Sequence, residues 1–391
     1  MIIKPKIRGF ICTNAHPAGC AQNVSEQIAY VKAQGAHTDG PKNVLVLGCS
    51  TGYGLASRIV SAFGYGANTL GVCFEKAPTE RKTGTAGWYN TAAFHSEASS
   101  ADLYAKTING DAFSKELKTD VIEAIKQDLG KIDLVIYSLA APRRTDPETG
   151  DVYKSTLKPV GDTYTTKTYD TDKDLIHDVT LEPANEDEIF NTVKVMGGED
   201  WELWLDALAE ADVLAENCTT TAYTYIGKEL TWPIYGHATI GKAKEDLDRA
   251  AASIIAKHQN VNCKAYVSSL KALVTQASSA IPVMPLYISL IYKVMKEEGT
   301  HEGCIEQIHG LFDLLLQASP ETDAQNRLRM DGKETNDATQ AKIKALWDQV
   351  TQENFHEISD YAGYHSEFLK LFGFDFDAVD YDADVSPLAD W

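Results

Sequence analysis

Short apolar runs alternate along the chain with segments whose apolar residues recur at helical spacing. The run Asn43–Gly48 reads NVLVLG, and the segment after it, Tyr53–Phe63, has the spacing of an amphipathic helix. Later runs of strand composition are Thr69–Glu75, Tyr104–Ile108, Ile132–Leu139, Cys218–Gly227 and Cys263–Leu270, and helical patterns cover Ser114–Leu129 and about Lys242–Lys257. Strands that are apolar on both faces and separated by helices are typical of parallel sheets covered on both sides. The pattern therefore predicts an α/β fold with a doubly wound, mostly parallel sheet.

One segment interrupts this alternation, between Ala141 and about Asn217. It holds Thr-rich runs of strand propensity followed by helical patterns around Glu186–Val195 and Asp200–Leu208. We expect one large domain over residues 1–391, with a core at about 42–140 and 217–300, an insertion at about 141–216 and a helical part at about 301–391. An insertion after a strand lies over the ligand crevice of such a sheet, so we expect it to help form the substrate site.

Composition limits the function classes. With 44% hydrophobic and 24% charged residues the chain has the composition of a soluble globular protein, and a net charge of −20 disfavours nucleic acids and anionic membranes. The seven cysteines form no C-x-x-C pair, which indicates a reducing compartment. The start, Met1–Phe10, predicts a strand rather than a signal peptide, and the apolar tract Ile281–Met295 is too short to span a bilayer. We expect a cytoplasmic protein with no membrane span.

The turn after the first core strand reads G-x-x-x-G-x-G, with glycines at Gly48, Gly52 and Gly54. A strand, a Gly-rich turn and a helix in this order direct backbone N–H groups at a pyrophosphate, as in Rossmann-type domains. The alternative is a turn that is purely structural. We expect a nucleotide at this turn.

Glu75 follows the second core strand, at the position where a carboxylate accepts hydrogen bonds from an adenosine ribose. A carboxylate there would repel a 2′-phosphate, so NADH is favoured over NADPH; the alternative is a solvent-facing Glu at a strand end. Asp111-Ala112 and Leu139-Ala140 follow the third and fourth strands, where short side chains border the adenine and the nicotinamide ribose.

Tyr235 and Lys244 lie in the segment after the fifth strand, with eight residues between them. Nine helical positions would place them on opposite sides of one helix, so Tyr235 is expected in a loop and Lys244 in the first turns of the next helix. A phenol stays protonated at neutral pH and donates to a developing oxyanion, and a nearby ammonium favours charge there. Tyr225 is a second phenol within reach, with core packing as its alternative role.

A metal site is not expected. The segment His301-Glu302-Gly303-Cys304 contains ligand residue types but lacks the i, i+4 histidine pair of a zinc helix. A G-x-S-x-G nucleophile elbow is also absent from the sequence.

Several long motifs make the chain resemble the trans-2-enoyl-thioester reductases, which comprise the FabV-type enoyl-acyl-carrier-protein reductases and the trans-2-enoyl-CoA reductases. The resemblance runs over nearly the full length. The motifs include GCSTGYGLASR at Gly48–Arg58, GTAGWYN at Gly84–Asn90, YSLAAPRRTDP at Tyr137–Pro147, VMGGEDW at Val195–Trp201, TIGKAK at Thr239–Lys244 and ALVTQASSAIPVMPLY at Ala272–Tyr287.

The resemblance implies a role for each candidate residue. Tyr235 would be the proton donor, Lys244 a cofactor-binding lysine and Tyr225 the substrate-binding tyrosine. The segments matching the NAD contacts are Gly48, Cys49, Ser50, Thr51, Gly52 and Tyr53, then Phe74 and Glu75, Asp111 and Ala112, Leu139 and Ala140, and Leu273, Val274 and Thr275. The implied activity is NADH-dependent reduction of enoyl-CoA or enoyl-carrier-protein thioesters in fatty acid synthesis, by a monomer.

Two other functions remain compatible with the residues alone. A short-chain ketoreductase or alcohol dehydrogenase would use the same Tyr and Lys on a carbonyl group. A non-catalytic sensor would bind NADH without reducing an enoyl thioester.

Overall fold

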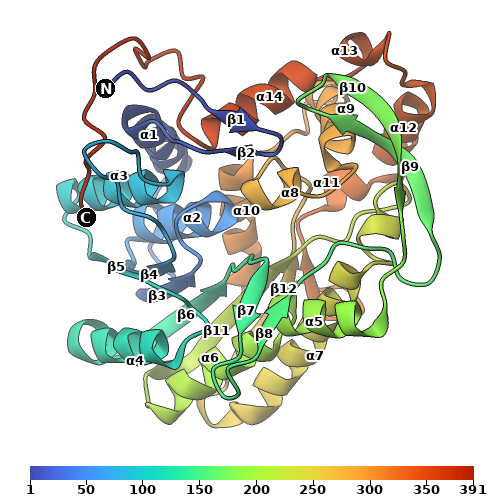
Figure 1. The fold of residues 1–391 in the computed structure, drawn as a ribbon. Coiled ribbons are helices and arrows are strands. Elements are labelled where there is room, and N and C mark those ends of the chain that lie inside the picture. Colours follow the sequence, from blue (N-terminus) through green and yellow to red (C-terminus); the bar gives the residue numbers. More distant parts are fainter.

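The computed structural model describes residues 1–391, and a seven-stranded parallel sheet forms its centre (Figure 1). The strands are β3 (Asn43–Leu47), β4 (Asn68–Cys73), β5 (Ala105–Asn109), β6 (Ile132–Tyr137), β11 (Leu214–Thr224), β12 (Lys264–Ser269) and β13 (Arg327–Arg329). Their order across the sheet is β13-β12-β11-β6-β3-β4-β5. The order reverses between β3 and β6, where ligands bind in doubly wound sheets. The predicted fold class is confirmed.

Helices cover both faces of the sheet. One face carries α1 (Pro17–Gln34), α2 (Gly52–Ile59), α3 (Ala86–Ser100) and α10 (Cys304–Leu315), and the other carries α4 (Lys115–Ala124), α6 (Glu199–Glu210) and α7 (Thr239–Lys257). Single π-helical turns extend α2 over Val60–Gly64 and α4 over Ile125–Leu129. Val44 and Val46 of β3 pack into one core cluster, and Leu45 and Leu47 pack into the other. Burial on both faces explains why β3 is apolar throughout.

The segment between β6 and β11 forms two antiparallel hairpins and two helices. They are β7 (Arg143–Thr145) with β8 (Val152–Lys154), β9 (Tyr164–Asp170) with β10 (Leu175–Leu181), then α5 (Glu186–Met196) and α6. Asn185 and Glu188 form a capping box at the start of α5. The backbone N–H of Val160 donates to the carbonyl of His237 over 2.9 Å, and Thr239 N–H donates to Lys158 over 3.0 Å. This segment therefore holds the loop that precedes α7.

The beginning of the chain departs from the strand that the sequence predicts. Only β1 (Ile7–Arg8) and β2 (Ile11–Cys12) form there, as a hairpin outside the seven-stranded sheet. Gly9 turns the chain with a positive φ of 55° after two residues, which leaves too little strand to enter the sheet. Of the strand expected over Met1–Phe10, only Ile7–Arg8 forms, and it lies outside the central sheet.

The last third of the chain is helical, and its helices other than α10 pack against one another beside the sheet (Figure 1). They are α8 (Gln276–Ser279), α9 (Met284–Glu297), α11 (Gly332–Thr335), α12 (Asp337–Gln349), α13 (Phe355–Ile358) and α14 (Tyr361–Lys370), with short 3-10 turns earlier at η3 (Trp232–Ile234) and η4 (Gln259–Val261). The longest apolar tract of the sequence becomes α9, which is buried in the core. None of the helices combines the length and the hydropathy needed to cross a bilayer.

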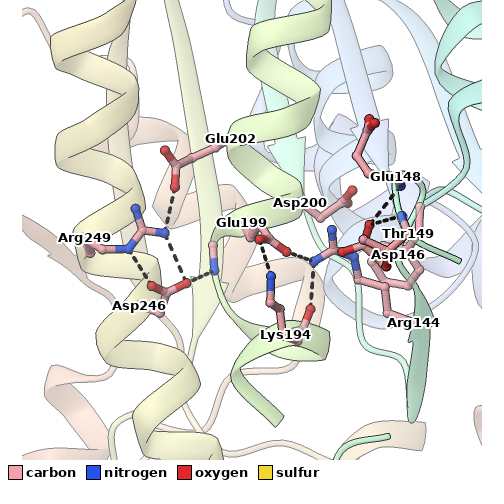
Figure 2. Close-up of polar contacts among 12 residues, drawn as sticks. Arg144, Asp146, Glu148, Thr149, Lys194, Glu199, Asp200, Glu202, Asp246 and Arg249 are labelled. Carbon is pink, nitrogen blue, oxygen red and sulfur yellow. Dashed lines mark hydrogen bonds and ion pairs between the residues drawn. The ribbon is translucent and has the colours of Figure 1, made fainter. Parts of the chain in front are cut away.

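A buried ion pair joins Lys118 of α4 to Asp200 of α6, and hydrogen bonds link this pair to β6 and to the loop after β5. Lys118 donates to Asp200 over 2.8 Å and to the carbonyl of Ala112 over 3.0 Å, and the Tyr137 hydroxyl donates to Asp200 over 3.1 Å. Figure 2 shows Asp200 beside Arg144, whose guanidinium donates to Glu199 over 2.7 Å. A charge that is buried away from water is tolerated only while its partner stays in place, so removing one member of this pair destabilises the fold.

Replacing Lys118 with methionine is expected to lower the free energy of unfolding by about 3–5 kcal/mol, because Asp200 would keep a buried charge without its cation. Urea denaturation followed by circular dichroism measures this change. Lys115→Met on the same helix is the matched control, since its pair with Glu148 is exposed and is expected to contribute about 1 kcal/mol or less. Equal losses in the two variants would contradict the prediction.

Candidate active site

The Gly-rich turn between β3 and α2 brings backbone segments into contact that a side chain would separate. A Cβ at Gly48 would lie 2.2 Å from the carbonyl oxygen of Ser138, and one at Gly54 would lie 1.8 Å from the carbonyl oxygen of Gly48. Thr51 precedes α2 without a side-chain cap, so the first N–H groups of the helix remain available. Free N–H groups at a helix N-terminus suit a pyrophosphate, so this turn fits a dinucleotide.

Glu75 is fixed against this turn. The Ser50 hydroxyl donates to one carboxylate oxygen of Glu75 over 2.5 Å, and the Thr85 hydroxyl donates to the other. A Cβ at Gly87 would lie 2.0 Å from the same carboxylate, so a larger residue there would displace the Glu75 side chain from this position. Glu75 therefore does not point freely into solvent, and its charge lies beside the Gly-rich turn.

The other segments expected to contact a cofactor end on the same edge of the sheet. A Cβ at Gly48 would lie 3.2 Å from the Leu139 side chain, and one at Gly52 would lie 3.8 Å from the Thr275 methyl group. The Ala112 carbonyl is turned away and accepts from Lys118 and Trp204. Phe74 is exposed at the end of β4, Leu273 and Val274 are buried, Asp111 is half-buried and Ala140 is exposed. The structure thus brings Leu139 and Thr275 to the Gly-rich turn from different strands.

Tyr235 lies in the loop between η3 and α7, and Lys244 lies in the second turn of α7, as the sequence predicts. The Tyr235 ring packs edge to face on Tyr225, with centroids 4.8 Å apart. A Cβ at Gly241 would lie 2.1 Å from the carbonyl oxygen of Gly236, so glycine allows this loop to lie directly against α7. Both phenols therefore lie at the carboxyl end of β11.

The tyrosine hydroxyl groups around this site differ in their hydrogen-bond acceptors. Tyr53 donates to the carbonyl of Lys271 over 2.8 Å, and Tyr225 donates to Glu334 over 2.8 Å. The Tyr235 hydroxyl makes no hydrogen bond within the protein. Burial raises the pKa of Tyr235, which keeps the phenol protonated. Tyr235 therefore holds a proton that an incoming group can take.

Lys244 has one partner, the carbonyl of Tyr223, to which its ammonium donates over 3.2 Å. It makes no hydrogen bond to Tyr235. Burial lowers the pKa of Lys244 to about 8. Since an ammonium has three N–H donors, two remain for hydroxyl groups of a bound molecule.

Three buried residues behind Tyr225 were not predicted from the sequence. They are Lys271, which follows β12; Tyr287 on α9; and Glu334 on α11. Burial lowers the pKa of Lys271 to about 8 and raises the pKa of Glu334. The position of Lys271 just after a core strand was a usable signal, whereas nothing in the sequence around Glu334 marks it as buried.

A surface hollow of about 340 Å³ lies between α5, α6 and α7, away from this site. Its charged side chains pair with one another: Lys194 with Glu199, and Arg249 with Glu202 and Asp246 (Figure 2). These side chains therefore leave no unpaired charge that could bind a ligand. The hollow is therefore a weaker candidate than the edge of the sheet.

Family models match almost the whole chain. Residues 2–80 match the NAD(P)H binding domain of trans-2-enoyl-CoA reductase, and residues 82–316 match the trans-2-enoyl-CoA reductase catalytic region. Residues 322–385 match a model described as an enoyl reductase FAD binding domain. The first two models together cover the Gly-rich turn, Tyr225, Tyr235 and Lys244.

Individual relatives are similar over their full length. An enoyl-[acyl-carrier-protein] reductase [NADH] of Pseudoalteromonas atlantica is 79% identical, with 100% of each chain covered. The crystal structure of Treponema denticola trans-2-enoyl-CoA reductase in complex with NAD has 49% identity and a TM-score of 0.95, with 100% of each chain covered. The Clostridium acetobutulicum trans-2-enoyl-CoA reductase in complex with NADH has 45% identity and a TM-score of 0.96 and covers 99% of this chain and 98% of its own.

Proposed function

Because this chain belongs to the trans-2-enoyl-CoA reductase family and is an oxidoreductase that reduces trans-2-enoyl thioesters with NADH, we propose that Tyr235 is its proton donor and Lys244 its cofactor-binding lysine. The observation that carries this proposal is the Tyr235 hydroxyl, whose proton is not committed to any acceptor in the protein. Tyr53 and Tyr225, by contrast, donate to internal acceptors.

The residues present fit the dinucleotide. In the proposed site the Gly-rich turn and the start of α2 hold the pyrophosphate, Glu75 accepts from the adenosine ribose, and Lys244 donates to a ribose hydroxyl. Phe74, Asp111, Ala112, Leu139, Ala140, Leu273, Val274 and Thr275 form the remaining wall. When bound, NADH supplies a hydride to the β-carbon of the enoyl thioester.

The protein must also stabilise the negative charge that develops on the substrate during the reduction. As the β-carbon gains the hydride, its former π electrons move toward the thioester and the carbonyl oxygen becomes an enolate. Tyr235 donates a hydrogen bond to that oxygen, and its phenol proton completes the saturated acyl thioester by way of the α-carbon. The Lys244 ammonium favours the negative charge that Tyr235 carries after it has lost its proton.

A substrate comparison tests this function. Purified protein with NADH is assayed with crotonyl-CoA, which has the 2,3-double bond, and with acetoacetyl-CoA, which has a 3-carbonyl group instead. NADH oxidation at 340 nm is expected with crotonyl-CoA, with acetoacetyl-CoA as the control for carbonyl reduction. A higher kcat/KM on acetoacetyl-CoA would identify a ketoreductase, and binding of NADH without oxidation would identify a sensor.

Glu75 is expected to select NADH over NADPH, because its carboxylate beside the Gly-rich turn repels a 2′-phosphate. A like-charge contact costs several kcal/mol, so Glu75→Gln is expected to raise kcat/KM for NADPH by about 10- to 100-fold relative to NADH. The values of kcat/KM for NADPH and for NADH are measured with crotonyl-CoA at fixed ionic strength. Glu80→Gln, which changes an exposed neighbour, is the control. An unchanged cofactor ratio in Glu75→Gln would contradict this role.

The description of the third family model raises the question of FAD, and residues 322–385 do not fit it. Their single strand, β13, leads through buried Asp331 into α11, a helix of four residues. The Asp331 carboxylate would repel a pyrophosphate, and it already accepts from Ser269 and Arg329. We assign no step to FAD.

The proposal extends to the acyl carrier, the oligomeric state and the location of the enzyme. The enoyl group is delivered on phosphopantetheine, which acyl-carrier protein and CoA share, and the carrier in the name of the 79% identical relative is acyl-carrier protein. We propose that the chain acts on the carrier protein as a monomer of one domain in the cytoplasm. Comparing kcat/KM for an enoyl-carrier protein with enoyl-CoA, and measuring the mass in solution by light scattering, test the carrier and the oligomeric state.

A further inference from the structure

A buried carboxylate lies directly behind the phenol that we assign to the substrate. Glu334 on α11 is 0% exposed and receives three hydrogen bonds. The hydroxyls of Tyr225 and Tyr287 each donate to its Oε1 over 2.8 Å, and the N–H of Ala272 donates to its Oε2 over 2.6 Å. These donors come from β11, α9 and the segment after β12, so one side chain joins three elements.

The charge of Glu334 is held by these hydrogen bonds rather than by a direct ion pair. The nearest cation is Lys271, whose ammonium donates to the carbonyls of Ala272 and Glu302 over 3.3 and 3.4 Å. Burial raises the pKa of Glu334, while Lys271 and the three donors favour its ionised form. An ionised carboxylate only accepts, so the bonds from the two phenols have a fixed direction.

That direction decides what Tyr225 can do. Tyr287 accepts from Gln340 over 3.1 Å, so the proton of Tyr287 points to Glu334. Tyr225 likewise donates its only hydroxyl proton to Glu334 over the shorter of its two contacts, 2.8 Å, and the Thr231 hydroxyl donates to the Tyr225 oxygen over 3.2 Å. The Tyr225 ring nevertheless packs on Tyr235 with centroids 4.8 Å apart. Of these two neighbouring phenols, only Tyr235 has a hydroxyl proton that is free to be donated to a substrate.

We propose that Glu334 is a positioning residue that acts through Tyr225: it takes the Tyr225 proton, fixes the ring against Tyr235, and leaves Tyr235 as the sole donor to the thioester oxygen. This proposal rests on the proposed function. Through Ala272 the same carboxylate also holds the start of the segment Leu273–Thr275, which we assign to the cofactor. The C-terminal part of the chain thus contributes to the active site without contacting the reacting atoms.

Glu334→Gln tests the proposal because the amide has nearly the same size but carries no charge, and an NH2 donor replaces one of its two acceptor oxygens. The neutral amide oxygen accepts the Tyr225 proton less strongly than a carboxylate does, and an NH2 group in place of Oε2 would face the N–H of Ala272. The Tyr225 ring would then be held less firmly against Tyr235, so the dissociation constant of crotonyl-CoA in the NAD⁺ complex, measured by calorimetry, is expected to rise about 3- to 10-fold. In a Tyr225→Phe background the same substitution is expected to change that constant by less than about twofold. Tyr287→Phe removes another donor to Glu334 and leaves the bond from Tyr225, so a smaller loss of affinity than in Glu334→Gln is expected.

Several outcomes would overturn the proposal. The first is that Glu334→Gln lowers the affinity equally in the wild-type enzyme and in the Tyr225→Phe variant. The second is that Tyr287→Phe lowers the affinity as much as Glu334→Gln does. If Glu334→Gln does not fold, Glu334→Asp withdraws the carboxylate and is tested in the same cycle. The binding measurement needs no turnover, so failure of Tyr235 as the proton donor would appear separately, in the rate of the Tyr235 variant.

Discussion

Tyr235→Phe is expected to lower kcat for crotonyl-CoA reduction by about 10²- to 10⁴-fold, the usual contribution of a general acid. The variant keeps the ring that packs on Tyr225 and loses only the hydroxyl whose proton is uncommitted. Steady-state NADH oxidation measures kcat, and quenching of protein fluorescence measures NADH affinity. The affinity is expected to stay within about twofold, because no part of the proposed cofactor wall is altered.

Tyr30→Phe on α1 is the control for this experiment, since that half-buried phenol lies outside the site. The solvent isotope effect on kcat adds a second readout, because it reports the transferred proton. A Tyr235→Phe enzyme with a near wild-type rate would remove the assignment, and the search for the donor would then turn to a bound water.

Lys244→Met is expected to reduce kcat/KM for NADH by about 10²- to 10³-fold, the range found when one charge-stabilising donor is removed. The methionine fills the same space, so the loss reports the ammonium. Initial rates at varied NADH and saturating crotonyl-CoA give the value. Lys242→Met is the matched control on the same turn of α7, because Lys242 is exposed and pairs with Glu245.

The same lysine predicts a pH dependence. Burial lowers the pKa of Lys244 to about 8, so the charged form is present below that pH and is lost above it in the free enzyme. We expect kcat/KM for NADH to fall above about pH 8, and Lys244→Arg to keep its charge and remove that fall. A decline at the same pH in the arginine variant would assign it to another group.

The core strands could be predicted from the sequence because the sheet is buried on both faces. In β3 successive side chains enter different apolar clusters, so the run is apolar without interruption. The edge strand β13 was not predicted. It has one neighbour, and its two arginines pair with Asp248 and Asp331 around a single apolar residue, Leu328, so the sequence of the strand resembles a loop. The strand expected over the first ten residues is shortened to Ile7–Arg8, because Gly9 turns the chain directly after it.

The candidate site was predictable where chemistry follows a strand directly. The Gly-rich turn, Glu75 and Tyr225 all stand at or just beyond strand ends, and the carboxyl ends of parallel strands meet on one edge. Glu334 was not predictable in this way. It lies on a four-residue helix in a polar stretch, and its burial depends on Tyr225, Tyr287 and Ala272, which are distant in sequence. Such a contact is visible only after the chain has folded.

The strand order also has a consequence for how the enzyme is made. Strands β3, β4 and β5 lie together on one half of the sheet and end by Asn109, whereas β11, β12 and β13 on the other half extend to Arg329. During synthesis the half that we assign to the nucleotide therefore emerges from the ribosome first and can pair early. The half with the phenols must wait for α11, because Glu334 joins its strands from behind. In a nascent chain the half that we propose to be catalytic is thus completed only after α11 has emerged.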